Sequence, residues 1–161
     1  MKIKIPFYKQ HTCYTCGPTS LHMVLSFLGD HKGELPLEKE AHTNHEVGTR
    51  HRGMIDTACK EGFYCYVNSN SSLNEIKHFI HIGLPVIVDV TEIQSNTGHY
   101  AVITGFDGKS FLMNDPWNGK NYKLSERKFL EYWQDSLTHS HKLIMAMSKK
   151  NFELGKQYLP Y

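Results

Sequence analysis

Three apolar segments in the second half of the chain, two of them joined by a tight turn, constrain the fold more than any other feature. Residues 84–90 (LPVIVDV) form an almost continuous apolar run, which is typical of a buried strand. Residues 99–106 (HYAVITGF) and 110–115 (SFLMND) predict two further strands, and the Asp107-Gly108 dipeptide between them is a strong hairpin signal. We therefore expect a largely antiparallel sheet in this half of the chain.

The first third of the chain predicts helices instead. Leu21, Val24 and Leu25 repeat at helical spacing, Pro18 suits a first turn, and Gly29 ends the pattern. Helices followed by hairpin-linked strands predict the α+β class, with the N-terminal helices packed on a mainly antiparallel sheet. Further helices are expected at residues 35–43, 52–62, 73–83 (capped by Ser72) and 125–133, and further strands at residues 2–5, 63–67 and 142–148.

The length and composition indicate one globular domain. The 161 residues are 40% hydrophobic and 21% charged, which is ordinary for a folded protein. No repeat, low-complexity tract or linker divides them. We expect a single domain over residues 1–161, with a core at about 5–148 and a C-terminal extension at 149–161.

Neither a nucleic acid nor a membrane is an expected partner. The formal net charge is only +2, and there is no long run of Lys or Arg. No segment approaches the roughly 18 consecutive apolar residues of a membrane helix. Charges interrupt the N-terminal residues 1–7 (MKIKIPF), which therefore do not resemble a signal peptide. The sequence predicts a soluble cytoplasmic protein, or a secreted one if a signal peptide has been removed.

Two cysteines lie three positions apart in residues 10–20 (QHTCYTCGPTS), which raises the question of a metal or redox site. A structural zinc site needs four ligands, commonly from a second paired motif, and the spacing of Cys59 and Cys65 does not supply one. A thioredoxin-like motif lies in a βαβ unit, which the later hairpins argue against. The sequence thus implies no metal and no cofactor, and it favours separate roles for Cys13 and Cys16.

Cys16 has the position that a nucleophilic cysteine requires. A thiol reacts as its thiolate, and a helix N-terminus stabilises that charge through the peptide dipoles and free N–H groups. Cys16-Gly17-Pro18 opens the first predicted helix, whereas Cys13 lies about one turn too early. Gly17 permits a close approach to a substrate. Acyl transfer also creates an oxyanion, for which the backbone N–H of Cys16 and the side-chain amide of Gln10 are candidate donors.

A nucleophilic cysteine also needs an imidazole and a group that orients it. His99 is the best candidate for the imidazole, because it follows Gly98 at the mouth of a buried strand. Asp115 ends the next strand of the same hairpin and is therefore the candidate orienting group. Asn114 is a weaker alternative, because strand alternation directs it to the opposite face.

These motifs resemble those of the papain-like cysteine peptidases. They are closest to the double-glycine leader peptidases that process bacteriocin precursors, and to their standalone bacterial relatives. The resemblance rests on QHTCYTCGPTSLHMVLSFLG, GHYAVITGF and NDPW and covers roughly residues 5–148. It implies that Gln10 supplies the oxyanion hole, Cys16 the nucleophile, His99 the base and Asp115 the orienting acid. Gly17 and Gly98, beside the nucleophile and the base, are assigned to substrate binding.

The resemblance implies a papain-like fold and a cysteine peptidase that cleaves a peptide or isopeptide bond through a thioester acyl-enzyme. The best-known leader peptidases are fused to a transporter, for which this sequence has no counterpart, so the identity of the peptide or protein substrate stays open. Two alternatives remain. A transpeptidase, as in phytochelatin synthase, passes the acyl group to an amine, and a catalytically silent module of the same fold only binds peptide.

The role of Cys13 stays open as well. One interpretation is a small buried filler. The other is a disulfide with Cys16, suggested by the three-residue spacing, that would inactivate the enzyme under oxidation.

Overall fold

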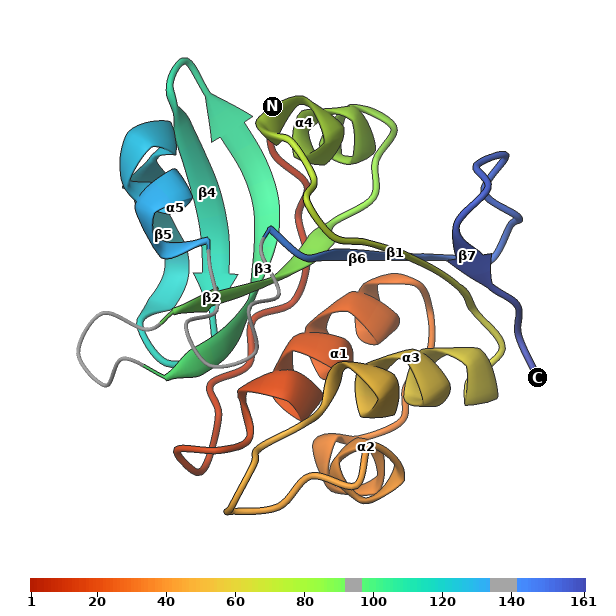
Figure 1. The fold of residues 1–161 in the computed structure, drawn as a ribbon. Coiled ribbons are helices and arrows are strands. Elements are labelled where there is room, and N and C mark those ends of the chain that lie inside the picture. The colour runs from red at the N-terminus through yellow and green to blue at the C-terminus, as the bar shows by residue number, and fades with distance from the viewer. Residues whose placement is uncertain (92–96, 134–141) are drawn as a thin grey trace.

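The computed structural model describes residues 1–91, 97–133 and 142–161 and shows helices on both faces of one sheet (Figure 1). No helix in this described part of the chain is long and apolar enough to cross a membrane. The helices are α1 (Cys16–Phe27), α2 (Glu34–Glu40), α3 (His51–Lys60), α4 (Leu73–His81) and α5 (Glu126–Tyr132). The strands are β1 (Tyr64–Asn68), β2 (Val86–Thr91), β3 (Gly98–Asp107), β4 (Ser110–Asp115), β5 (Gly119–Ser125), β6 (Ile144–Ser148) and β7 (Gln157–Tyr158).

The described strands form one sheet in the order β5-β4-β3-β2-β6-β1-β7, and their neighbouring pairs are antiparallel. The predicted hairpin between β3 and β4 is confirmed, and Gly108 in its turn has a positive φ of 47°. After α5 the chain returns to insert β6 between β2 and β1. The α+β class and the mainly antiparallel sheet are therefore as predicted.

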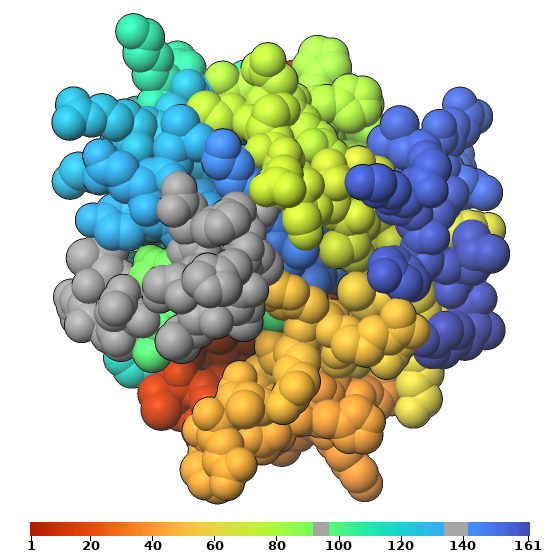
Figure 2. Space-filling view, in the orientation of Figure 1, coloured from red at the N-terminus to blue at the C-terminus, as the bar shows by residue number. Residues whose placement is uncertain are grey.

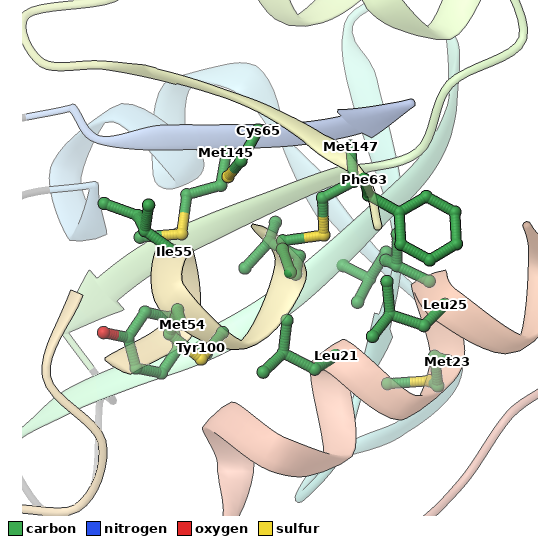
Figure 3. Close-up of a cluster of buried hydrophobic side chains, with 14 of the residues drawn as sticks. Leu21, Met23, Leu25, Met54, Ile55, Phe63, Cys65, Tyr100, Met145 and Met147 are labelled. Carbon is green, nitrogen blue, oxygen red and sulfur yellow. The ribbon is translucent and has the colours of Figure 1, made fainter. Parts of the chain in front are cut away.

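Helices α1 and α3 cover one face of the sheet and α2 packs on their outer side, and together they enclose a hydrophobic core (Figures 1 and 3). Leu21 and Leu25 of α1 and Met54 of α3 are buried there with Tyr100 of β3 and Met145 of β6. This packing fixes α1 against β3, so the first residue of α1 is held in a defined position relative to the sheet.

Helices α4 and α5 cover the opposite face, where Phe79 and Phe129 belong to a second core. Strand β2 contributes to both cores. Ile87 faces the first core, whereas Val86 and Val88 face the second. The strand is apolar on both faces because helices cover it from both sides, which explains the apolar run in the sequence.

Gly53 is required by the close packing of α2 against α3. A Cβ atom at this position would lie 2.3 Å from the carbonyl oxygen of Ala41, a backbone atom at the end of α2. We expect Gly53→Ala to lower the free energy of unfolding by about 3 kcal/mol through overpacking, although Gly→Ala at an open helix position is stabilising. Urea unfolding measures this loss. The control is Gly155→Ala, whose Cβ would meet no atom within 4 Å and which should leave stability nearly unchanged.

The strand predicted at residues 2–5 is wrong. Lys2 forms only an isolated bridge with Gly105, and the Ile3 N–H donates to the carbonyl of Thr104 at 2.7 Å. Strand β2 pairs with β3 only as far as Ile103. Only residues 104–107 of β3 extend beyond β2, and the N-terminal residues contact this short edge. It is too short to pair with a full strand.

Two strands were not predicted. β5 pairs with β4, but its seven residues (GKNYKLS) are half-buried or exposed and show no apolar pattern. β7 has two residues and pairs with β1, so it ties the C-terminal residues to the edge of the sheet. The C-terminal extension also contacts α3, where the Tyr161 N–H donates to the Cys59 carbonyl at 3.0 Å. Figure 2 shows these C-terminal residues (dark blue) on the surface beside those of α3 (yellow).

Candidate active site

Cys16 is the first residue of α1 and is buried. The preceding Thr15 does not cap the helix with its side chain. Its hydroxyl instead accepts from the Thr12 N–H at 3.2 Å, and its N–H donates to the Thr12 carbonyl at 3.5 Å. A tight turn therefore leads into α1, and Cys16 lies at the positive end of the helix dipole as predicted.

His99 and Asp115 are brought together by the β3–β4 hairpin. His99 is only 6% exposed, and its Nε2 lies 2.7 Å from Oδ1 of Asp115. Asn114 pairs with Val102 across the hairpin and accepts from the Asn121 N–H at 3.3 Å. Asp115 is therefore the carboxylate beside His99, and Asn114 is engaged elsewhere, in agreement with the prediction from strand alternation.

The imidazole of His99 also meets the Cys16 thiol. Burial alone lowers the pKa of His99, but the hydrogen bond to Asp115, and after it the hydrogen bond to Cys16, outweigh burial and raise the pKa to about 10. Because Nε2 contacts Asp115, the ring nitrogen that remains for Cys16 is Nδ1. A pKa near 10 means that His99 carries its proton at neutral pH when it faces a thiolate.

Asp115 is held by more than His99. Burial raises the pKa of Asp115, but the hydrogen bond and charge of His99, followed by the donors of Asn118, outweigh burial and lower the pKa to about 2. Oδ1 accepts from the N–H groups of Trp117 and Asn118 at 2.9 and 3.0 Å, and Oδ2 accepts from Nδ2 of Asn118 at 3.0 Å. The carboxylate thus opens a turn and orients His99 at the same time. The role of Asn118 was not predicted, and the Asn118-Gly119 turn dipeptide was its only signal.

Gln10 is buried and lies in the loop that leads to α1. Its backbone N–H donates to the Pro116 carbonyl at 3.0 Å, so the loop is tied to the residue after Asp115. Its side-chain Nε2 donates to the Thr12 carbonyl at 2.7 Å, which leaves a second amide N–H. Its buried Oε1 has no hydrogen-bond partner among the residues that the structure describes. A buried polar atom without a partner lowers the stability of the fold.

The two glycines assigned to substrate binding have different surroundings. Gly17 is buried, and a Cβ there would lie 2.7 Å from Oγ1 of Thr49 and 3.1 Å from Sδ of Met54. Glycine at this position is thus explained by the packing of α1 against Thr49 and α3. Gly98 is exposed at the start of β3, directly before His99 and opposite Thr91 of β2.

The other cysteines differ from Cys16. Cys59 and Cys65 are fully buried, and burial raises the pKa of both thiols, which keeps them protonated and unreactive. Cys13 is exposed, so its interpretation as a buried filler is wrong. The four thiols are free. Within residues 1–91, 97–133 and 142–161, no group of three or more His, Cys, Asp or Glu residues is arranged to hold a metal ion.

A second histidine–carboxylate pair joins the helices to the sheet. Nε2 of His51, the first residue of α3, lies 2.6 Å from Oδ2 of Asp89 in β2. Asp89 is buried, and Tyr100, its partner on β3, contacts the His51 ring edge-on at 6.0 Å. This pair was not predicted from the sequence, although an acidic residue inside an apolar strand requires a buried partner.

A small pocket lies beside the candidate catalytic residues. Its lining includes His99, Asp115 and Asn118, but neither Cys16 nor Gln10. The remaining lining is mainly apolar and aromatic: Val90, Thr91, Met113, Tyr122, Leu124 and Tyr132. The pocket therefore has the chemistry to receive an apolar side chain next to the imidazole.

Comparisons with known proteins identify the family to which this geometry belongs. The model of the Peptidase C39-like family matches residues 2–140. The chain belongs to the Peptidase C39-like family. An uncharacterized protein of Methanothermobacter marburgensis is 30% identical to it over 112 residues, which span 70% of this chain and 72% of that protein. The predicted resemblance is thereby confirmed.

Solved C39 domains show the same fold. The peptidase domain of Streptococcus ComA, a bifunctional ABC transporter, is 22% identical with a TM-score of 0.74 over 91% of this chain and 98% of that one. A double-glycine motif protease from an AMS/PCAT transporter, solved with its leader peptide, is 21% identical with a TM-score of 0.72 over 91% and 92%. A Bacillus anthracis protein described as a C39-like peptidase is 18% identical with a TM-score of 0.76 over 94% and 100%. At these identities the likeness shows the papain-like fold.

Proposed function

We propose that this C39-like chain is a cysteine peptidase that cleaves a peptide or isopeptide bond through a thioester on Cys16. The observation that carries the proposal is the double engagement of His99. One buried imidazole lies 2.7 Å from Asp115 through Nε2, and Cys16 is the other group that raises its pKa. An imidazole placed between a carboxylate and a thiol at a helix N-terminus is the arrangement required for nucleophilic acyl transfer.

In the proposed reaction, His99 takes the proton of the Cys16 thiol at Nδ1, and Sγ attacks the carbonyl carbon of the scissile bond. His99 then gives that proton to the leaving amine as the C–N bond breaks, which leaves a thioester on Cys16. Water attacks the thioester, His99 accepts its proton, and the proton returns to Sγ as the carboxylic acid leaves. Asp115 keeps Nε2–H directed toward its own carboxylate and stabilises the imidazolium.

The negative oxygen formed during each attack requires hydrogen-bond donors. The backbone N–H of Cys16 lies at the start of α1, where helix N–H groups have no partners within the helix. Gln10 is the second proposed donor. Its hydrogen bonds to Thr12 and Pro116 hold the loop that presents its amide.

A peptide is the substrate class that the site and the family support. The related double-glycine motif protease was solved in complex with a leader peptide. In this chain the pocket beside His99 offers an apolar lining for one side chain of a bound peptide. We propose a peptide or protein substrate held along this side of the imidazole, with water or an amine as the final acyl acceptor.

Trapping the acyl-enzyme tests this function. The protein is mixed with a peptide library, quenched in acid and mapped by mass spectrometry. We expect an acyl adduct on Cys16 that identifies the acyl group, and no adduct in Cys16→Ala. Added glycine amide distinguishes hydrolysis from acyl transfer by the products. If no peptide forms an adduct, and iodoacetamide labels Cys16 no faster than the exposed Cys13, the domain only binds peptide and the proposal fails.

A further inference from the structure

The residue after Gln10 connects the candidate oxyanion loop to helix α2. Nδ1 of His11 lies 3.0 Å from Oε1 of Glu34, the first residue of α2. Nε2 of the same ring lies 3.4 Å from Oε2 of Glu38, one turn further along the helix. Both ring nitrogens of His11 therefore face carboxylates of α2, and the loop is attached to that helix directly beside Gln10.

Glu34 also contacts α1, the helix that begins with Cys16. The hydroxyl of Thr19 lies 2.7 Å from the same Oε1 that accepts from His11. Nδ1 of His22, one turn further along α1, lies 3.9 Å from Oε2. Glu34 thus bridges the loop that carries Gln10 and the helix that carries Cys16, although it belongs to neither.

The two sides of this bridge are the two proposed donors to the oxyanion. Gln10 is the neighbour of His11, and Cys16 lies one turn before Thr19 in α1. The other hydrogen bonds of Gln10 run to Thr12 in the same loop and to Pro116 of the β4–β5 turn. The His11–Glu34 contact therefore connects the loop that carries Gln10 to α2, and the Glu34–Thr19 contact connects α2 to α1.

We propose that Glu34, acting through His11, is a positioning residue that holds the Gln10 amide at its working distance from Cys16. This inference rests on the proposed peptidase function. Oxyanion donors act over a narrow range of distance, and a displacement of about 1 Å can reduce a rate roughly 10²-fold. His11 is 46% exposed on its side chain, and an ion pair with such an exposed partner adds little to folding stability. Loss of the His11 contact should therefore affect turnover more than folding. The Glu34 side chain is 16% exposed and accepts from the buried Thr19 hydroxyl, so it also contributes to stability.

The test uses a fluorogenic peptide that carries the acyl group identified by the trapping experiment, and compares single variants. Gln10→Ala should lower kcat by about 10²–10³-fold, as expected for the loss of one oxyanion donor. Glu34→Ala and His11→Ala should lower kcat roughly tenfold or more, with KM nearly unchanged. The thermal unfolding temperature should be nearly unchanged in His11→Ala and moderately lowered in Glu34→Ala, which removes the acceptor of the buried Thr19 hydroxyl. His11→Asn should restore most of the rate, because its side-chain N–H occupies the place of Nδ1. Leu35→Ala, an exposed change in α2, is the control and should have no effect.

Two further measurements separate positioning from general damage. Alkylation of Cys16 by iodoacetamide forms no oxyanion, so its rate should be the same in Glu34→Ala as in the wild type. In a Gln10→Ala background, Glu34→Ala should cause no additional loss, because the residue through which it acts is already gone.

Full kcat in Glu34→Ala, a parallel loss of alkylation, or additive losses in the double variant would each overturn the positioning role and leave the peptidase intact. A wild-type protein without Cys16-dependent turnover would overturn both proposals.

Discussion

Cys16→Ala will abolish peptide hydrolysis while the fold remains intact. We expect kcat to fall by about 10⁵–10⁶-fold, the loss seen when a nucleophile that acts as part of a triad is removed. No other described thiol can substitute for it. Cys59 and Cys65 are fully buried with raised pKa values, and Cys13 precedes α1 in an exposed turn.

Turnover of a fluorogenic peptide measures this loss, and peptide binding by calorimetry shows that the site is still formed. Cys16→Ser gives a matched control for size, because it keeps a hydroxyl that is a far weaker nucleophile at neutral pH. Cys13→Ser removes the neighbouring thiol and should retain activity. Iodoacetamide should label Cys16 ahead of Cys59 and Cys65. Hydrolysis that survives in Cys16→Ala would show that the reaction uses another group.

The central elements of the fold could be predicted because their local turn and apolar patterns favour the same structure as their packing in the core. The Asp107-Gly108 turn joins two apolar strands, and this hairpin alone brings residues 99 and 115 to adjacent strands. Helix α1 was predictable from its apolar spacing and from Gly29, whose φ of 95° ends it. The hairpin and α1 are determined by residues that are close in the sequence, so a single sequence was sufficient to predict them.

The edges of the sheet could not be predicted in the same way. Strand β5 exists because β4 offers it hydrogen bonds after the Asp115 turn, and its own residues carry no apolar pattern. Residues 2–5 have the pattern of a strand, but only a short stretch of the β3 edge is available to them. In both places the neighbouring strand decides the outcome, and local propensity does not.

The candidate site shows the same division. The order Gln, Cys, His, Asp could be read from motifs, and the structure brings His99 to both Cys16 and Asp115. The bridges that surround these residues could not be read. His51 meets Asp89 across 38 positions, and His11 meets Glu34 across 23. Scattered polar residues in a sequence carry no sign of such pairings, which arise only when the layers pack.

His99→Gln will remove the proposed general base while preserving the contact with Asp115. The glutamine Nε2 can occupy the place of the histidine Nε2, which lies 2.7 Å from the carboxylate, but it cannot accept the thiol proton. We expect kcat/KM to fall by about 10³–10⁴-fold. Thermal unfolding should change far less than in His99→Ala, which leaves Asp115 buried without its main partner. Activity within tenfold of the wild type would exclude His99 as the base.

Asp115→Asn tests how His99 keeps its proton. The carboxylate raises the pKa of His99 to about 10 against burial, so its loss should lower that pKa. Because the imidazolium protonates the leaving amine in the proposed reaction, the alkaline limb of kcat/KM against pH should lie near pH 10 in the wild type and at least about one unit lower in Asp115→Asn. Asn118→Ala, which removes the Nδ2 donor from the same carboxylate but keeps its charge, should leave that limb in place.

The same shift links folding to pH. The pKa of His99 in the folded protein lies above its ordinary value of 6.5, so the stabilisation from its pairing is complete below pH 6.5 and is lost as the pH rises toward 10. In Asp115→Asn, the free energy of unfolding measured in urea should decline less between pH 6.5 and 10 than in the wild type. An alkaline activity limb and a stability curve that both match the wild type would mean that Asp115 does not control the charge of His99, and the proposed triad would reduce to Cys16 and His99.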